Sequence, residues 1–181
     1  VDALREAFDQ AVSRRVRIHL GRALCFHADT MAVDFLLEDI AQQISGRLPK
    51  PYRKHLAVPP EHGWLPDPVY SMYAVALTER GRELAPMLVT VARKVEDRAE
   101  RFSDKRESQF EYVHVACRAA ERNPCGEMAP PLEALLEKRC LRQLVIRYDG
   151  DPRSATDSGL ERRAYLELSI GRALARCGDR R

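Results

Sequence analysis

Apolar residues three and four positions apart recur along most of this chain, and that spacing predicts a largely helical fold. Residues 2–16 are the first example, because their apolar side chains fall on one helical face: Leu4, Ala7, Phe8, Ala11 and Val12. We expect this helix to continue or restart through Leu24. The alternation of Val16, Ile18 and Leu20 also fits a short strand, so that alternative stays open.

The overall composition suits a globular chain without a membrane span. Hydrophobic residues make up 45% of the 181 residues and charged residues 31%, which allows a packed core. No apolar run approaches the ~20 residues that cross a bilayer, and the first residues lack the layout of a signal peptide. We therefore expect a soluble protein of the cytoplasm. The five cysteines include no CxxC pair, which suits reduced thiols better than disulfides.

Two short helices are predicted next. Apolar residues from Phe35 to Ile44 recur at helical spacing, and Gly46 stands where such a helix would end. Pro51 fits the first turn of the second helix, because its missing N–H would have no helical partner there. The pair Pro59-Pro60 ends that helix.

A strand is predicted over residues 69–77, VYSMYAVAL, which are rich in aromatic and β-branched side chains. Thr78 then fits the N-cap of a long helix that reaches Phe102. One face of that helix carries apolar residues at near-heptad spacing: Leu88, Val91, Ala92, Val95, Ala99 and Phe102. Pro86 should kink or divide the helix, because it removes a backbone hydrogen bond to Arg82.

This order of elements, followed by LTERGRELAP at residues 77–86, resembles the winged-helix repressors of the HxlR and MarR type. In that family the wing strand runs into L-T-x-x-G-x-x-L, with a proline two residues later in the HxlR case. Residues 39–46 look like the family's second helix. Five residues fall at the spacing of its recognition helix and exit: Tyr52, Leu56, Pro59, Gly63 and Trp64. The resemblance covers residues 18–102.

The resemblance implies a mainly α fold with a small β-wing. Residues 1–102 would form a winged helix-turn-helix with a long C-terminal dimerisation helix, and residues 109–181 a helical C-terminal region. The polar segment 103–108, SDKRES, is the expected boundary. The function that this implies is a homodimeric transcriptional regulator that binds double-stranded DNA.

The residues expected to contact DNA cluster in the recognition-helix position, where no acidic residue lies between Arg47 and Pro60. Basic side chains there suit phosphate contact and the reading of base edges in the major groove. The predicted set is Arg47, Lys50, Tyr52, Arg53, Lys54 and His55. The predicted dimer seam is Leu88, Val91, Val95, Ala99 and Phe102, and packing of this face into the chain's own core is the alternative.

Three segments are predicted in the C-terminal region. Residues 109–122 read as a helix ended by 123–126, NPCG. Residues 131–148 read as a second helix, although residues 144–146, LVI, could form a strand. The sequence SGLE at residues 158–161 is a capping box for a last helix that runs through Leu168, Gly171 and Leu174 and stops at Gly178. Dimerisation, ligand sensing or contact with a protein partner are the roles left open for this region.

The sequence contains no phosphate-binding loop or hydrolase motif, so we expect no enzyme activity, no catalytic residues and no cofactor. No metal site is predicted, since the spacing of His114, Cys117, Cys125 and Cys140 matches no structural zinc pattern. One rival interpretation is a non-catalytic interaction subunit of a larger assembly, built on a winged-helix scaffold. A helical small-molecule or metal sensor working through Cys117 and His114 is a third.

Overall fold

Every regular element in the described part of the chain is a helix. The computed structural model describes residues 1–49, 67–98, 109–142 and 158–178. The elements in chain order are α1 (Asp2–Gln10), α2 (Arg14–Phe26), α3 (Val33–Ile44), α4 (Asp67–Ala76), η1 (Gly81–Leu84), α5 (Ala85–Lys94), α7 (Phe110–Arg122), η2 (Gly126–Met128), α8 (Ala129–Leu136), α9 (Arg139–Arg142) and α10 (Ser158–Cys177).

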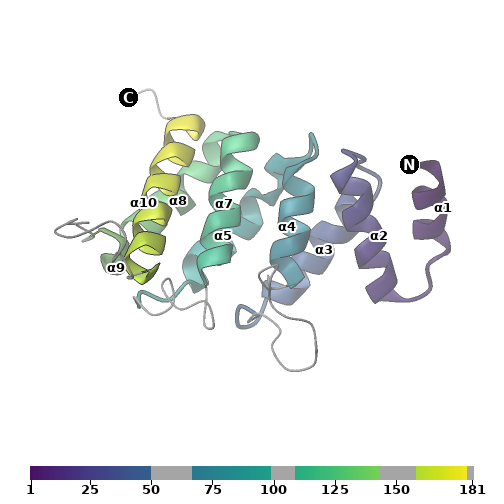
Figure 1. Ribbon diagram of the computed structural model, residues 1–181, viewed down its shortest axis with the longest axis horizontal. Helices are drawn as coiled ribbons and strands as arrows, with labels where there is room; N and C mark the ends of the chain where they lie inside the picture. Colours follow the sequence, from purple (N-terminus) through teal and green to yellow (C-terminus); the bar gives the residue numbers. More distant parts are fainter. Residues whose placement is uncertain (50–66, 99–108, 143–157, 179–181) are drawn as a thin grey trace.

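The helices form two layers (Figure 1). The front layer is α2, α4, α7 and α10, which lie side by side in that order, and the back layer is α3, α5 and α8. The N-terminal helix α1 packs on α2 at one end of the stack, and α10 lies at the other end. The main contacts among described helices join neighbours in this order, which is the arrangement of an α-solenoid.

One hydrophobic cluster joins the two layers. Each layer contributes side chains that are almost completely buried, including Leu36, Ile40, Met72, Leu88, Tyr112 and Leu132. Helices α4 and α5 share this cluster with α7 and α8, so one core joins the described helices before residue 99 to those after residue 108. A smaller cluster of Phe8, Leu24 and Ala32 attaches α1. Apolar burial is the main favourable term for such a stack.

The predicted β-wing is wrong, because residues 69–77 belong to helix α4 and its following turn rather than to a strand. Most of α4 is buried, including Val69, Met72 and Val75, since α2, α3 and α7 all pack against it. A helix covered on several sides loses its polar face, and its sequence then reads as an apolar run that periodicity cannot distinguish from a strand. The winged helix-turn-helix is therefore not the fold of this protein.

The predicted long helix over residues 78–102 is also wrong. Thr78 lies in the turn after α4, where its hydroxyl donates to the Val75 carbonyl and accepts from the Arg80 N–H. The segment is divided near Pro86, as one of the two expected effects of this proline, because η1 ends at Leu84 and α5 begins at Ala85 with Pro86 in its first turn. Helix α5 ends at Lys94, because Val95 adopts an extended backbone.

The more periodic segments were predicted correctly. Residues 2–24 are helical with a break at 11–13, which excludes the strand alternative at Val16, Ile18 and Leu20. Helices α3, α7 and α10 follow their predicted positions. The predicted helix over residues 131–148 is divided in its described part, where α8 ends at Leu136 and α9 starts at Arg139. The second short helix at 51–60, the boundary at 103–108 and the possible strand at 144–146 lie outside the described residues.

The turn between α4 and η1 depends on close packing against the end of α7. The Asn123 side chain donates to the Ala76 carbonyl at 2.8 Å and so caps the C-terminus of α4. A Cβ on Gly81 would lie 2.8 Å from Asn123 Cγ and 3.1 Å from Ala76 Cα. Glycine is therefore required at position 81 by the approach of α7 and not by an unusual backbone angle.

We expect Gly81→Ala to lower the free energy of unfolding by about 1–3 kcal/mol, because the added methyl displaces Asn123 from its cap. Gly171→Ala is the matched control, since a Cβ on Gly171, within α10, would have no neighbouring atom within 4 Å. That change should raise stability by about 0.5–1 kcal/mol, because alanine favours helix. Urea unfolding of both variants measures whether each substitution lowers or raises the free energy of unfolding. Equal effects of the two substitutions would contradict the packing argument.

Arg80 ties the turn after α4 to the start of α3. Its guanidinium contacts the Asp34 carboxylate at 2.6 Å and the Glu83 carboxylate at 2.7 Å. Hydrogen bonds from Arg80 hold the pKa of both carboxyl groups below their usual values of 3.8 and 4.5. A lowered folded-state pKa adds stability above the usual pKa, and this contribution is lost as the pH falls through the folded-state value.

We therefore expect the stability advantage of the wild-type protein over Arg80→Met to be constant near neutral pH and to shrink below about pH 4.5. Urea unfolding at a series of pH values measures the difference. Asp97, whose pKa is lowered by hydrogen bonds from Cys140, contributes equally to both proteins and cancels. A difference that grows on acidification would contradict the assignment.

Candidate functional site

Helices α7 and α10 lie side by side and run in the same direction (Figure 1). His114 contacts Tyr165 and Glu121 contacts Arg172, and the partners are 51 residues apart in both pairs. A constant offset means that the two helices are parallel and stay in register. Side chains from both therefore meet at successive levels. We call this surface the α7–α10 face, and it comprises His114 and Arg118 of α7 with the exposed residues on one side of α10: Tyr165, Leu168, Arg172 and Arg176.

His114 links three helices of the front layer. Its Nδ1 lies 2.7 Å from the hydroxyl of Tyr73 on α4, and its Nε2 lies 3.2 Å from the hydroxyl of Tyr165 on α10. Which partner donates at each of these two contacts depends on the tautomer of the imidazole. The Glu111 carboxylate lies 3.9 Å from Nδ1. These contacts orient both tyrosines.

A second aromatic side chain packs against the Tyr165 ring and supports it. Phe110 stacks on it with ring centroids 6.2 Å apart and an interplanar angle of 25°. Phe110 is buried, whereas Tyr165 remains 43% exposed. Burial, together with the charge of Glu111, raises the pKa of Tyr73 above its usual value. Tyr165 is thus an exposed aromatic ring held in a fixed position.

Leu168 is the most exposed large hydrophobic side chain of the described helices, at 69%. It is three residues after Tyr165 and four before Arg172, so the three side chains share one side of α10. Both neighbours contact α7, and Leu168 lies beside them on the exposed side of α10. The exposed leucine and the fixed tyrosine form a small apolar surface.

Two arginines of the α7–α10 face share a single carboxylate. Glu121 contacts Arg118 at 3.0 Å and Arg172 at 3.5 Å. The two arginine side chains are 54% and 60% exposed, while Glu121 is 19% exposed. The guanidinium groups are therefore positioned by Glu121 and still accessible to solvent.

No family model, curated protein or solved structure matches this chain. None of the described helices is long and apolar enough to cross a membrane.

The predicted DNA-binding residues are largely outside the described part of the chain. Of the six, only Arg47 is described; its side chain is 75% exposed and lies 3.9 Å from Glu96. The other five are Lys50, Tyr52, Arg53, Lys54 and His55. Their role in DNA binding stays a prediction, although the described residues do not show the β-wing of the winged helix that suggested it.

The predicted dimer seam lies in the interior of this protein. Leu88, Val91 and Val95 are at most 2% exposed and belong to the main hydrophobic cluster. They pack against side chains of the neighbouring helices. This agrees with the alternative interpretation, in which the apolar face belongs to the core of the chain. Ala99 and Phe102 lie outside the described residues.

The residues considered for a metal or redox site are dispersed. Cys117 is buried, and burial raises the pKa of its thiol to about 12, while the His114 ring contacts tyrosines. Within the described residues, no three His, Cys, Asp or Glu side chains are placed to hold a metal ion.

Sequence reasoning assigned Leu168 and Gly171 to the apolar face of the last helix and did not consider Tyr165, Arg118 or Arg172. A signal was present, because Tyr165, Leu168 and Arg172 follow helical spacing and mix an aromatic, an aliphatic and a basic side chain. The alignment of α10 with α7 could not be read from sequence, since it depends on contacts between distant segments.

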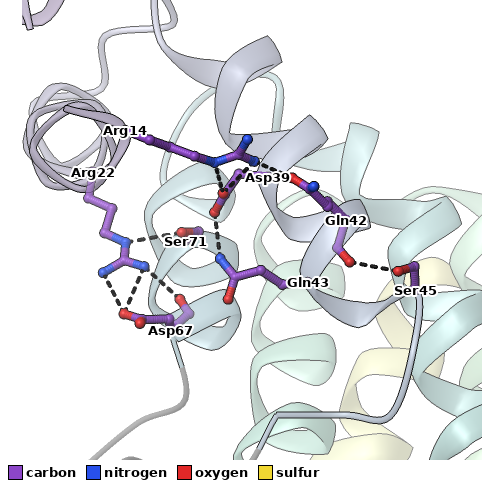
Figure 2. A network of polar contacts seen from close by, with 8 residues as sticks. All are labelled: Arg14, Arg22, Asp39, Gln42, Gln43, Ser45, Asp67 and Ser71. Carbon is purple, nitrogen blue, oxygen red and sulfur yellow. Dashed lines mark hydrogen bonds and ion pairs between the residues drawn. The ribbon is translucent and has the colours of Figure 1, made fainter. Parts of the chain in front are cut away.

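A separate polar network connects α2, α3 and α4 (Figure 2). Arg14 and Gln43 bind the carboxylate of Asp39, which is 2% exposed. Arg22 donates to the Ser71 hydroxyl at 3.0 Å and to the Asp67 carbonyl at 2.8 Å. These groups are satisfied within the protein, and Arg22 fixes the first turn of α4. We therefore assign the network a structural role.

We expect Arg22→Met to lower the free energy of unfolding by about 1–3 kcal/mol, because the buried Ser71 hydroxyl loses its donor. Arg15→Met is the matched control, since Arg15 is an exposed arginine of the same helix. Its effect should stay within about 0.5 kcal/mol. Urea unfolding compares the two, and similar losses would show that Arg22 does not position α4.

Proposed function

We propose that this protein is an interaction module that binds a partner polypeptide on the α7–α10 face. The main observation that supports this proposal is the exposure of Leu168 beside the fixed ring of Tyr165. Isolated exposed leucines are common on protein surfaces, but this one adjoins an oriented aromatic ring and positioned arginines. Tyrosine and arginine are the residue types that dominate binding energy at protein interfaces, together with tryptophan.

The surface is suited to binding because its side chains are already ordered. Tyr165 is held by the His114 hydrogen bond and by stacking on Phe110, and Arg172 is held by Glu121. Ordering a flexible side chain on binding costs about 0.5–1.5 kcal/mol, so preformed contacts reduce this cost. Burying Leu168 against a partner adds roughly 1–2 kcal/mol through its apolar area.

This proposal keeps the interaction-subunit interpretation of the sequence and replaces its winged-helix scaffold with a two-layer helical stack. Stacked helices give such proteins extended surfaces on which a polypeptide can lie. The α7–α10 face provides a surface of this kind at the α10 end of the stack (Figure 1).

Selection from a phage-displayed library of random peptides tests the proposal. We expect peptides that bind the wild-type protein and lose at least about tenfold in affinity against Leu168→Glu, because the new carboxylate removes the apolar anchor. Phe26→Glu is the matched control, since Phe26 is also an exposed apolar residue of the front layer, on α2. It should leave binding unchanged.

Equal binding of the selected peptides to wild type, Leu168→Glu and Phe26→Glu would reject the α7–α10 face as the site. Unfolding midpoints of the three proteins should agree closely, because both substituted positions are exposed. The comparison then reports binding and not stability.

A further inference from the structure

We infer that the partner segment is acidic, with an aliphatic or aromatic side chain that contacts Tyr165 and Leu168 and carboxylates that contact the neighbouring arginines. This inference rests on the proposed function and adds the chemistry of the partner. It is carried by the charge of the α7–α10 face, where the arginines outnumber the carboxylate between them.

Glu121 accepts one hydrogen bond from Arg118 at 3.0 Å, and its other oxygen forms an ion pair with Arg172 at 3.5 Å without a hydrogen bond. Arg118 uses Nη1 for its contact with Glu121, and Arg172 uses Nε. A guanidinium group has five N–H donors in a planar fork that matches the two oxygens of a carboxylate. Both arginines are more than half exposed, so a second carboxylate can reach their remaining donors.

The positive charge continues toward the C-terminal ends of both helices. Arg122 and Arg176 lie four residues after Arg118 and Arg172, in the last turns of α7 and α10, and both are exposed. Arg176 continues the row of Arg172 on α10, whereas Arg122 donates to the Leu77 carbonyl at 3.5 Å and so lies toward the turn after α4. The C-terminal end of each helix carries a partial negative charge from the helix dipole, which lowers the positive potential there. The same partial charge stabilises cationic side chains at these positions. The acidic residue near the other end of the face is Glu111, whose carboxylate lies 3.9 Å from His114 Nδ1.

The apolar side chain between these groups favours a polypeptide over a nucleic acid as the source of the negative charge. Leu168 is 69% exposed and is followed after four residues by Arg172. A peptide can place an apolar side chain on Leu168 and carboxylates on the arginines. A sugar–phosphate backbone offers the charges but no aliphatic side chain for Leu168.

Helix geometry gives the expected spacing within the partner. Arg172 and Arg176 are about 6 Å and 12 Å beyond Leu168 along α10, at ~1.5 Å per residue. An extended peptide advances ~3.3 Å per residue. The carboxylates should therefore follow or precede the apolar anchor by about two to four residues.

Fluorescence anisotropy with a defined pair of synthetic peptides tests this inference. One labelled peptide carries a leucine anchor with glutamates at the two-to-four spacing, and the other has glutamine in their place. We expect the glutamate peptide to bind wild type at least about tenfold more tightly than the glutamine peptide, with weaker binding at higher salt.

The double variant Arg118→Gln/Arg172→Gln should abolish this preference, while glutamine can still donate to Glu121 and support the fold. Arg15→Gln/Arg93→Gln is the matched control, because it removes the same charge from exposed arginines on α2 and α5. The control should retain the preference. Equal losses in both double variants would assign the effect to net charge and overturn the site.

The outcomes separate this inference from the proposed function. Library peptides that depend on Leu168 but bind independently of glutamate and of Arg118 and Arg172 would overturn only the acidic partner. Absence of any Leu168-dependent peptide would reject the proposed function itself. Random-sequence duplex DNA that binds through Arg118 and Arg172 and displaces the glutamate peptide would also overturn the inference, in favour of a nucleic-acid partner.

Discussion

Apolar burial between the front and back layers is the interaction on which the rest of this fold depends. Helix α4 is the clearest case, because it packs against α2, α3 and α7 and buries most of its residues. The polar contacts then set finer details: Arg22 fixes the start of α4, and Asn123 caps its end. Lys94 supports the same arrangement by donating to three carbonyl groups at the end of α3.

The candidate site follows from this packing, since no single helix contains it. His114 positions tyrosines from two other helices, and Glu121 positions arginines from its own helix and from α10. The parallel alignment of α7 and α10 determines which side chains become neighbours. A small rotation of α10 would separate Tyr165 from Phe110 and Arg172 from Glu121, so the core holds the surface in place.

Sequence periodicity predicted α1, α2, α3, α7 and α10 because each keeps a polar side that makes the helical repeat visible. It failed for α4, whose valines and tyrosines were read as a strand although several helices cover them. It also extended α5 beyond Val95, where the backbone becomes extended. For the site, Leu168 looked like a core residue, because only the position of α7 shows that it remains uncovered. These errors share one cause, since burial by distant segments is not encoded in local spacing.

Packing between successive neighbours also limits how far a local disturbance can spread. Helix α1 is attached through its contact with α2 and a small cluster around Phe8, at the opposite end of the stack from α10. Detachment of α1 would break its contacts with α2, with Asp29 and with Phe35 of α3, and would leave the interfaces around α7 and α10 intact. Opening can therefore begin at an end of such a stack without simultaneous loss of the whole core. The protein can tolerate damage or motion near its N-terminal helix while its opposite end stays ordered.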